Sequence, residues 1–316
     1  MADKNRTTNG TRTLKDCMAD FRFRLAEAPP IAYGIGCAWL GRSPDDRRQV
    51  KEDVATLMTA FEQGFRYYDT SRAYGQSEAV VGQFVKEIPR DRIFLASKSR
   101  VPYTVHPNEA AKALEENLQI SLSRLNTDHL DLYQLHDVDT LSHIWDEGGV
   151  LDTLLNFRKT GLVRHIGLAT RQHELLEEAA RQGSFDSILT YNDYTPINQS
   201  AKALIEVAEA CRVAVVNGSP LCFGWLSGLD PRERAVGDSP RDKERQMRSV
   251  RFYDYCQKRE VSTLAAALQF PLRHPGIDIT LTGPATSNEV RASAQALGER
   301  IPDEFWTDWQ EQGFLT

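Results

Sequence analysis

The sequence predicts an α/β fold, a (β/α)8 or TIM barrel formed as a single domain. From about residue 31 onward, short apolar runs of strand length alternate with longer amphipathic segments of helix length. This alternation is typical of βαβ units and a parallel sheet, and eight such units are the number that closes a barrel. A length of 316 residues suits one barrel of ~250 residues with insertions. Two domains of ~150 residues, or a doubly wound sheet, remain alternatives, because periodicity does not show whether a sheet closes.

The elements are expected in a regular order. The strands are interpreted as residues 31–37, 65–69, 93–98, 130–136, 163–168, 187–191, 214–218 and 277–281. The helices are expected at residues 47–63, 77–87, 108–125, 150–160, 172–182, 199–211, 245–258 and 287–297. Pro107-Asn108 is a start signal for one helix, and Lys159-Thr160-Gly161 is a stop signal for another.

Three segments stand outside this alternation. Residues 1–30 are expected to form a solvated N-terminal extension to the barrel of residues 31–316. Residues 220–245, rich in Gly, Pro, Arg and Asp, are expected to form a long loop after the seventh strand. Residues 303–312 are expected to form an extra C-terminal helix.

Composition excludes several classes of protein. Hydrophobic residues make up 41% of the chain and the net charge is -6, values of an ordinary globular protein that argue against nucleic-acid or anionic-membrane binding. No apolar run reaches the ~20 residues of a membrane span, and the N-terminus lacks an apolar signal core. The odd number of widely spaced cysteines argues against a disulfide framework or a structural zinc site. A cytoplasmic protein is therefore expected.

Three consecutive apolar runs each end in an ionisable residue. Those runs end in Asp69, Lys98 and His136, and Tyr74 follows Asp69 by five residues in the next loop. In a barrel, the carboxyl ends of the strands surround one pocket, so these four side chains are expected to converge there. Each taken alone has an ordinary structural explanation, such as a helix cap, a surface charge or a packing aromatic. Four at consecutive strand ends favour a catalytic site.

These residue types suggest acid–base chemistry at a carbonyl. The Lys98 ammonium is expected to favour the phenolate of Tyr74 and so to lower its pKa, while Asp69 keeps Lys98 charged and in place. Tyr74 could then exchange a proton with a carbonyl or alcohol oxygen, and His136 could orient that oxygen. None of the four groups is redox-active, so a hydride carrier such as a nicotinamide cofactor is the economical electron source.

Residues 65–78, FRYYDTSRAYGQSE, resemble the signature of the aldo/keto reductase family. Lys98, His136, the Ile-Gly-Leu at 166–168, the Ser-Pro-Leu at 219–221 and the Leu-Thr-Gly-Pro-Ala at 281–285 also stand where that family has similar motifs. The resemblance implies a (β/α)8 barrel that interconverts carbonyls and alcohols with NAD or NADP and without a metal. Tyr74 would be the acid/base, Lys98 and Asp69 its tuning pair, and His136 the carbonyl-orienting partner.

The family pattern also implies which residues bind the cofactor, and the turn after the first strand is interpreted as lying close to the ligand, with Trp39 as a wall of the pocket. Trp39 and Asp137 are assigned to the substrate. The cofactor would be held by Gly36, Thr170, Arg171, Tyr191, Ser219, Pro220, Leu221, Gly283, Ala285, Thr286, Ser287 and Arg291.

Within the family, residues 266–275 and 301–306 resemble the branch of aldose 1-dehydrogenases (L-fucose, D-threo-aldose and L-galactose dehydrogenases) and pyridoxal 4-dehydrogenases. That branch implies a sugar lactol or a small cyclic hemiacetal as substrate.

Several positions depart from the family pattern. Gly218 stands where many relatives place a tyrosine that stacks on the nicotinamide, so stacking must come from elsewhere or be absent. Thr170-Arg171 replaces a Ser-Asn pair, and Tyr191 replaces a glutamine. Ala285 stands where NADP-binding relatives often have Lys or Arg, which removes a strong phosphate contact and favours NAD over NADP. Arg291 could compensate.

Two alternatives remain open from the sequence. The basic residues crowded between positions 232 and 251 form either a solvated face or a flap that closes over phosphates or an acidic substrate. The chain as a whole is either an enzyme acting on a small carbonyl or sugar substrate, or a nucleotide-holding regulatory or binding subunit of a larger assembly. The sequence does not predict an oligomeric state.

Overall fold

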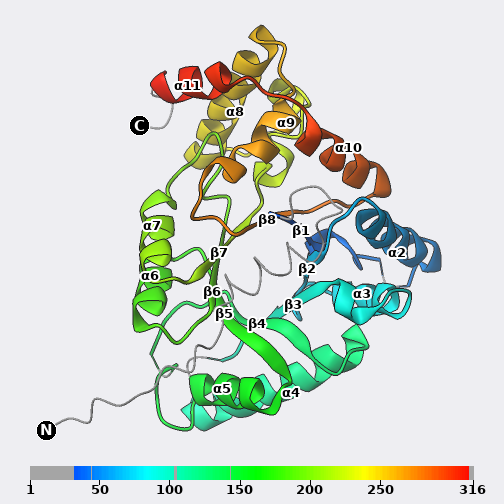
Figure 1. Ribbon diagram of the computed structural model, residues 1–316, viewed down its shortest axis with the longest axis vertical. Coiled ribbons are helices and arrows are strands. Elements are labelled where there is room, and N and C mark those ends of the chain that lie inside the picture. The colour runs from blue at the N-terminus through cyan, green and yellow to red at the C-terminus, as the bar shows by residue number, and fades with distance from the viewer. Residues whose placement is uncertain (1–31, 44, 103–104, 143, 313–316) are drawn as a thin grey trace, which may run out of the picture.

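The computed structural model describes residues 32–43, 45–102, 105–142 and 144–312. Eight parallel strands form a closed barrel in chain order, with β1 hydrogen-bonded to both β2 and β8 (Figure 1). The predicted (β/α)8 barrel is therefore confirmed, and the doubly wound alternative is wrong. The predicted extension at residues 1–30 lies outside the described residues.

The strands agree with the predicted runs to within a few residues. They are β1 (Tyr33–Gly36), β2 (Tyr67–Asp69), β3 (Phe94–Ser99), β4 (Leu130–His136), β5 (Val163–Ala169), β6 (Ser187–Tyr191), β7 (Ala214–Gly218) and β8 (Ile279–Thr282). The helices that surround them are α2 (Arg47–Glu62), α3 (Ser77–Lys86), α4 (Pro107–Leu125), α5 (Val150–Thr160), α6 (His173–Gln182), α7 (Lys202–Ala210), α8 (Pro240–Lys258), α9 (Thr263–Gln269), α10 (Ser287–Gly298) and α11 (Asp303–Glu311).

Strand alternation divides the apolar residues into two cores. Successive side chains of a strand point to opposite faces, so every second residue enters the barrel. The interior holds a separate cluster that includes Tyr67, Phe94 and Leu132, with the Tyr67 and Phe94 rings stacked at 4.8 Å. A larger cluster fills the layer between the strands and the helices. The barrel is thus a packed scaffold on which the strand ends are held in fixed register.

Two helices differ from the prediction. Helix α8 begins at Pro240, because Ser239 caps it by accepting a hydrogen bond from the Asp242 backbone and proline is well suited to the first helical position. The predicted loop at 220–245 was therefore too long by six residues. Helix α9 was not predicted. Ser262 caps it in the same way, and its alanine-rich run is buried against neighbouring helices.

The predicted extra C-terminal helix is confirmed as α11. Its buried aromatic residues pack against α8, with the Trp309 ring 4.9 Å from those of Phe252 and Tyr255. The Trp309 indole N–H also donates to the Pro196 carbonyl at 3.1 Å. Helix α11 is therefore held against α8 and the loop that contains Pro196.

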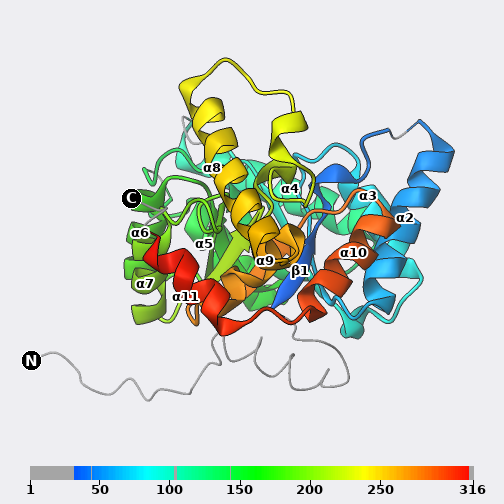
Figure 2. The ribbon, with the colours of Figure 1, turned by 90° about the horizontal axis from the view of Figure 1, so that it is seen from above.

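The segment between β7 and α8 stands above the carboxyl ends of the strands (Figure 2). It contains the short 3-10 helices η3 (Cys222–Gly224) and η4 (Pro231–Glu233). Two of the basic residues between positions 232 and 251 pair with nearby carboxylates: Arg232 bridges Asp230 and Asp254, and Arg245, in α8, pairs with Asp242. These pairs agree with a solvated face rather than with arginines aimed at a ligand.

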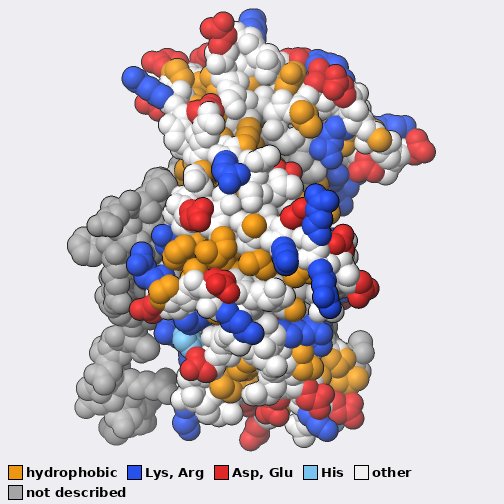
Figure 3. Space-filling view, turned by 90° about the vertical axis from the view of Figure 1, so that its right-hand side faces the viewer, with side chains coloured by type: hydrophobic (Ala, Val, Ile, Leu, Met, Phe, Trp, Pro, Cys, Tyr) orange, Lys and Arg blue, Asp and Glu red, His pale blue; other side chains and the backbone are white. Residues whose placement is uncertain are grey.

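The exposed charges are mixed in sign. On the face shown in Figure 3, Lys and Arg side chains alternate with Asp and Glu rather than forming a patch of one sign. Within the described ranges, no helix has both the length and the apolar composition that a bilayer crossing requires.

Candidate active site

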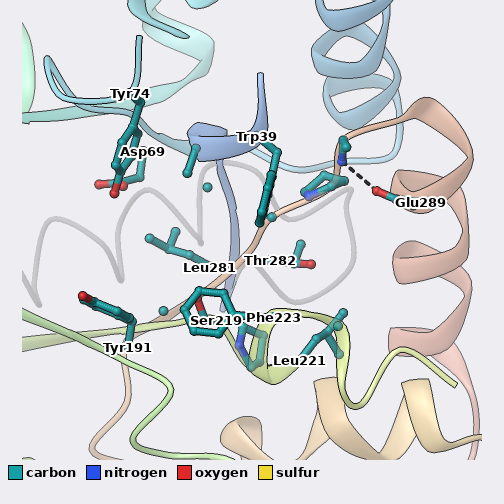
Figure 4. A pocket seen from close by; sticks show the side chains of 18 of the residues that line it. Trp39, Asp69, Tyr74, Tyr191, Ser219, Leu221, Phe223, Leu281, Thr282 and Glu289 are labelled. Carbon is teal, nitrogen blue, oxygen red and sulfur yellow. Dashed lines mark hydrogen bonds between the residues drawn. The ribbon is translucent and has the colours of Figure 1, made fainter. Parts of the chain in front are cut away.

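A cavity of about 750 Å³ opens at the carboxyl ends of the strands. We call it the cleft. Asp69, Tyr74 and Tyr191 lie at one end of it, Glu289 lies at the other, and Trp39 and Phe223 lie between them (Figure 4). The cleft is therefore elongated, with the four predicted catalytic residues gathered at one end.

Strand alternation directs three of these residues into the barrel. Asp69 lies two residues after the inward-facing Tyr67, and Lys98 lies four after the inward-facing Phe94. His136 follows the inward-facing Leu132 by the same spacing. The three strands are neighbours, so these side chains meet above the interior core.

A buried ion pair forms the base of the site. The Lys98 ammonium contacts Asp69 Oδ1 and donates to the Thr70 carbonyl at 3.0 Å, and Gln134 donates to Asp69 Oδ2 at 3.1 Å. Burial raises the pKa of the Asp69 carboxyl, and the Lys98 charge acts against that rise. Burial alone lowers the pKa of Lys98, but the Asp69 carboxylate raises it well above its ordinary value. Lys98 is thus held as a cation.

Tyr74 leans over this pair from the loop after β2. The Lys98 ammonium lies 4.9 Å from the centre of the Tyr74 ring, and the His136 ring meets it edge-on at 5.5 Å. Burial raises the pKa of the Tyr74 phenol above 10.0, and Lys98 offsets only part of this rise. The expectation of a lowered pKa was wrong in its net direction, because removing the phenolate from water costs more than Lys98 restores.

His136 is uncharged at neutral pH. Burial and then the nearby Lys98 cation lower its pKa to about 3. Its Nδ1 lies 2.9 Å from the Ser71 hydroxyl, which fixes the plane of the ring. A neutral imidazole carries one proton and one lone pair, so His136 can act as a hydrogen-bond partner for a substrate oxygen without adding charge.

Most of the residues assigned to ligands line the cleft. They are Gly36, Trp39, Asp137, Tyr191, Ser219, Pro220, Leu221, Gly283 and Ala285. Asp137 has a left-handed backbone, φ 48°, and its carboxylate receives a charged hydrogen bond from Arg100 at 3.0 Å.

Five assigned residues do not line the cleft. The Thr170 hydroxyl donates to the Val138 carbonyl at 2.9 Å, and the Arg171 guanidinium donates to Asp193 at 2.7 Å. Thr286 caps α10, and Ser287 shares a hydrogen bond with Thr59 of α2 at 3.1 Å. Arg291 donates to Asn288 at 3.2 Å, so it is turned to its own helix rather than to the cleft.

Comparison with known proteins identifies the family. The sequence profile of the Aldo/keto reductase family matches residues 33–313. The chain belongs to the aldo/keto reductase family. It is 24% identical over 324 residues to a pyridoxal 4-dehydrogenase of Microbacterium luteolum, covering 90% of this chain and 94% of the relative. It is 26% identical over 317 residues to a D-threo-aldose 1-dehydrogenase of a Pseudomonas species, covering 90% and 93%.

A solved aldo-keto reductase from Klebsiella pneumoniae, in complex with NADPH, has the same fold. Its TM-score is 0.70 at 21% identity, and the match covers 92% of each chain. The family profile and the two named relatives, rather than this match of fold, confirm the family assignment and the branch resemblance found in the sequence.

The structure explains one departure of this aldo/keto reductase from its family. A Cβ atom on Gly218 would lie 2.8 Å from the Cβ of Tyr191, closer than real contacts allow. Tyr191 of β6 therefore occupies the space beside the end of β7. Arg171, itself anchored by Asp193, lies 5.3 Å from the centre of the Tyr191 ring. An aromatic ring is thus present in this part of the cleft, but it comes from the neighbouring strand.

Sequence reasoning missed several residues of the cleft. Arg42 and Phe223 belong to loops whose shape periodicity does not predict, although both line it. Arg100 had a usable signal, because it follows Lys98 by two residues and so continues the same face of the strand. Glu289 had one too, since Thr286-x-x-Glu289 is a capping-box pattern.

Proposed function

We propose that this protein is an NAD(P)-dependent oxidoreductase that interconverts a carbonyl and an alcohol, or a sugar lactone and its lactol, on a small sugar-like substrate. One observation carries the proposal. Tyr74, Lys98, Asp69 and His136 meet at one end of a cleft whose volume of about 750 Å³ suits an extended dinucleotide and a small substrate.

Three of these four side chains take part in the transfer of the proton. Tyr74 is protonated at neutral pH, as an ordinary tyrosine is, and burial raises its pKa further, so it can donate a proton to a carbonyl oxygen during reduction. Lys98 makes the phenolate that is left behind less costly, and Asp69 holds Lys98 in place. In the direction of oxidation, the same phenolate accepts the proton of the alcohol. A nicotinamide cofactor, when bound, supplies or accepts the hydride, which none of these side chains can do.

The cleft fits such a cofactor along its length. Gly36, at the end of β1, lines the cleft without a side chain, so a ligand can approach its backbone, whereas Tyr191 and Trp39 fill the space beside Gly218 and Gly283. Tyr191 offers an aromatic wall near the catalytic end, where the reactive ring has to lie. Ser219, in the loop that follows β7, adds a hydroxyl to the same wall.

The far end of the cleft favours NAD over NADP. The adenosine half of a dinucleotide has to extend away from the catalytic end, toward Glu289 (Figure 4). One carboxylate oxygen of Glu289 accepts the Ala285 N–H at 2.7 Å, which leaves the other available to a ribose hydroxyl. A carboxylate repels a 2′-phosphate, and no basic side chain stands at Ala285 to offset this repulsion. Arg42 also lines the cleft, but its guanidinium lies over the Trp39 ring, 4.7 Å from the centre of that ring.

The substrate end suits a polar molecule of small size. Asp137 and Arg100 together present oxygen acceptors and nitrogen donors at the mouth beside His136. Such paired groups match the hydroxyls of a sugar. The names of the two relatives, an aldose dehydrogenase and a pyridoxal dehydrogenase, point to substrates of the same class.

The test is turnover with both cofactors. The full-length protein is incubated with NAD or NADP and a panel of aldoses, and with NADH or NADPH and small hydroxylated aldehydes, while the absorbance of reduced nicotinamide is followed. Turnover with at least one aldose is the expected result. Tight cofactor binding by titration, with no turnover across the panel, would contradict the proposal and would favour a nucleotide-holding subunit.

A further inference from the structure

A fully buried glutamine lies inside the barrel, beneath the catalytic residues. Gln134 is on β4, in register with Lys98 of β3 and two residues before His136, so its side chain points into the barrel as theirs do. Its Nε2 donates to Asp69 Oδ2 at 3.1 Å. Gln134 is not among the residues that line the cleft. Any effect of Gln134 on the reaction therefore acts through Asp69.

The two oxygens of the Asp69 carboxylate have different donors. The Lys98 ammonium contacts Oδ1, and the Gln134 amide donates to Oδ2. An ammonium and an amide NH₂ group can only donate, so neither can accept a proton from a neutral carboxylic acid. A proton on Oδ2 would point at the amide NH₂, and a proton on Oδ1 would point at the ammonium. The two donors together therefore favour the ionised form of Asp69, although the residue is only 2% exposed.

The other end of the Gln134 amide is left without a partner. Its Oε1 is buried and accepts no hydrogen bond from the residues that the structure describes. A buried, unpaired amide oxygen costs stability, and an apolar side chain of similar length would avoid that cost. Packing alone does not explain an amide at this position, whereas the hydrogen bond to Asp69 does.

Gly167 leaves space for the glutamine. It is in register with Gln134 of β4 on one side and with Ser187 of β6 on the other. A Cβ atom on Gly167 would lie 2.4 Å from the Ser187 Oγ and 3.0 Å from the Gln134 Cγ. Such a side chain would therefore displace one of its two neighbours. The absence of a side chain here lets Gln134 keep its position beside Asp69.

We propose that Gln134 is a positioning residue that keeps Asp69 ionised, and that through Asp69 it keeps Lys98 charged beside Tyr74. A neutral Asp69 would leave the buried Lys98 cation without a counter-charge, and burial would then favour loss of the Lys98 proton. The phenolate that Tyr74 forms on donating its proton would lose the charge that stabilises it. Gln134 thus extends the reaction to lower pH. This catalytic half rests on the proposed function, whereas the ionisation of Asp69 does not.

The titratable groups around Asp69 allow its ionisation to be followed. They are Lys98 of β3, Tyr74 of the loop after β2, Cys37 after β1, and Tyr67 one layer below. Burial raises the pKa of Tyr74, Cys37 and Tyr67 above their ordinary values, so all three stay neutral at pH 5 to 8. Burial also raises the pKa of Asp69, and Lys98 and the Gln134 hydrogen bond act against that rise. A change of ionisation in this range therefore reports on Asp69 with its partner Lys98.

The first experiment follows kcat for reduction of D-glyceraldehyde by NADH or NADPH from pH 5 to 9.5. Gln134→Met keeps the length of the side chain but removes the donor, so Asp69 should be protonated at higher pH than in wild type. Loss of a hydrogen bond to a charged group is expected to move the acid midpoint of kcat upward by about one pH unit. Gln269→Met is the matched control, because this glutamine of α9 donates only to the backbone carbonyls of Ala296 and Glu299.

Gln134→Glu should change the opposite limb of the profile. Two facing carboxyl groups share one proton, and while that proton is held the new group can donate to Asp69 as the amide does. The variant should therefore remain active on the acid side and lose activity on the alkaline side at lower pH than wild type. A role in packing alone would shift neither limb.

The second experiment needs no turnover. Urea unfolding is measured at pH 5 and pH 8 for wild type and Gln134→Met. The folded variant should hold the Asp69 proton to higher pH than folded wild type, while both unfolded chains release it at the same pH. The variant therefore loses more stability as the pH rises, so its urea midpoint relative to wild type should be lower at pH 8 than at pH 5. In an Asp69→Asn background, and in Gln269→Met, this dependence on pH should be absent.

The outcomes separate the two claims. The same relative urea midpoint at pH 5 and pH 8 would overturn the effect of Gln134 on the ionisation of Asp69. An unchanged acid midpoint of kcat in a folded Gln134→Met protein would overturn the catalytic half. If Gln134→Met does not fold, Gln134→Glu decides, and an alkaline limb equal to that of wild type would overturn the proposal. Absence of turnover in wild type would count against the proposed function, and the urea measurement would still stand.

Discussion

The two ends of the cleft are built differently. At the catalytic end, Asp69, Lys98 and His136 come from three adjacent strands and are at most 6% exposed. Trp39 and Phe223, which lie between that end and Glu289, come from the short 3-10 helices η1 (Cys37–Trp39) and η3 and are 49% and 51% exposed. Backbone pairing of the sheet fixes the positions of the first group, whereas a few local contacts hold the second. Chemistry is thus placed on the rigid part of the fold and ligand selection on the adjustable part.

The backbone shows the same contrast. Cys222 and Phe223 both have left-handed backbones, with φ of 49° and 57°, which ordinary side chains rarely adopt. The Arg234 guanidinium donates to the Phe223 carbonyl at 3.2 Å and holds this turn. At the catalytic end, the strands that carry the reacting residues have ordinary extended pairing. The turn at Cys222 and Phe223 therefore has a left-handed backbone that strands β2, β3 and β4 do not have.

The largest effect is expected from Tyr74→Phe, at the strand-supported end. Removing the phenol takes away the proton donor, so kcat is expected to fall about 10²–10⁴-fold with little change in stability. Steady-state kinetics with the best aldose and thermal unfolding measure both quantities. Tyr253→Phe, on helix α8 and outside the cleft, is the matched control. Full turnover by the Tyr74→Phe protein would remove Tyr74 from the mechanism.

The second-largest effect, a loss of stability, is expected from Lys98→Met. This change leaves the Asp69 carboxylate buried without its partner, which is expected to cost about 3–5 kcal/mol in urea unfolding. The double variant with Asp69→Asn should recover much of that loss, because no uncompensated charge remains. Lys86→Met, at the exposed end of α3, should stay close to wild type. Equal losses in the single and double variants would mean that the pair is not coupled.

The sequence predicts the residues carried by strands better than it predicts those held by local contacts. Apolar periodicity located all eight strands, and the ionisable residue at the end of a strand identified Asp69, Lys98 and His136. The direction of the Tyr74 pKa was predicted wrongly, because the sequence shows Lys98 nearby but not the burial that outweighs it. The other wrong predictions, the start of α8 and the placement of Thr170 and Arg171, have local causes.

Local hydrogen bonds explain those failures. The start of α8 at Pro240 depends on a single capping serine. Thr170 and Arg171 occupy the expected sequence positions, but an internal acceptor, the Val138 carbonyl or Asp193, holds each side chain away from the cleft. A pattern of residue types predicts which strand a side chain follows, and it does not predict which neighbour captures that side chain.

A smaller effect, on the pH dependence of stability, is expected from the protonation of His136. Burial and Lys98 lower its pKa from 6.5 to about 3, so between these values the unfolded chain binds a proton that the folded chain does not. Stability is therefore fully present above pH 6.5 and is lost as the pH falls toward 3. At pH 5 this single group costs about 2 kcal/mol relative to neutral pH.

Urea unfolding at pH 7 and pH 5 measures this cost. His136→Gln should lose less stability than wild type over that interval, and Ser71→Ala, which keeps the imidazole, should lose nearly as much as wild type. The same pH slope in His136→Gln and wild type would mean that His136 does not titrate in the folded state as expected.

The smallest effect, and the one that tests the loop end, is expected from Glu289→Gln. Glutamine keeps an oxygen that can accept the Ala285 N–H, so the loop should hold its shape while the negative charge is lost. Removing that repulsion is expected to raise the affinity for NADPH relative to NADH roughly tenfold, about 1.4 kcal/mol, without changing kcat. Titration of both cofactors by fluorescence or calorimetry gives the ratio, and Glu299→Gln, at the other end of α10, is the control. A changed kcat with an unchanged affinity ratio would show that the loop end acts on the chemistry itself, and the division between a rigid catalytic end and a selective far end would then fail.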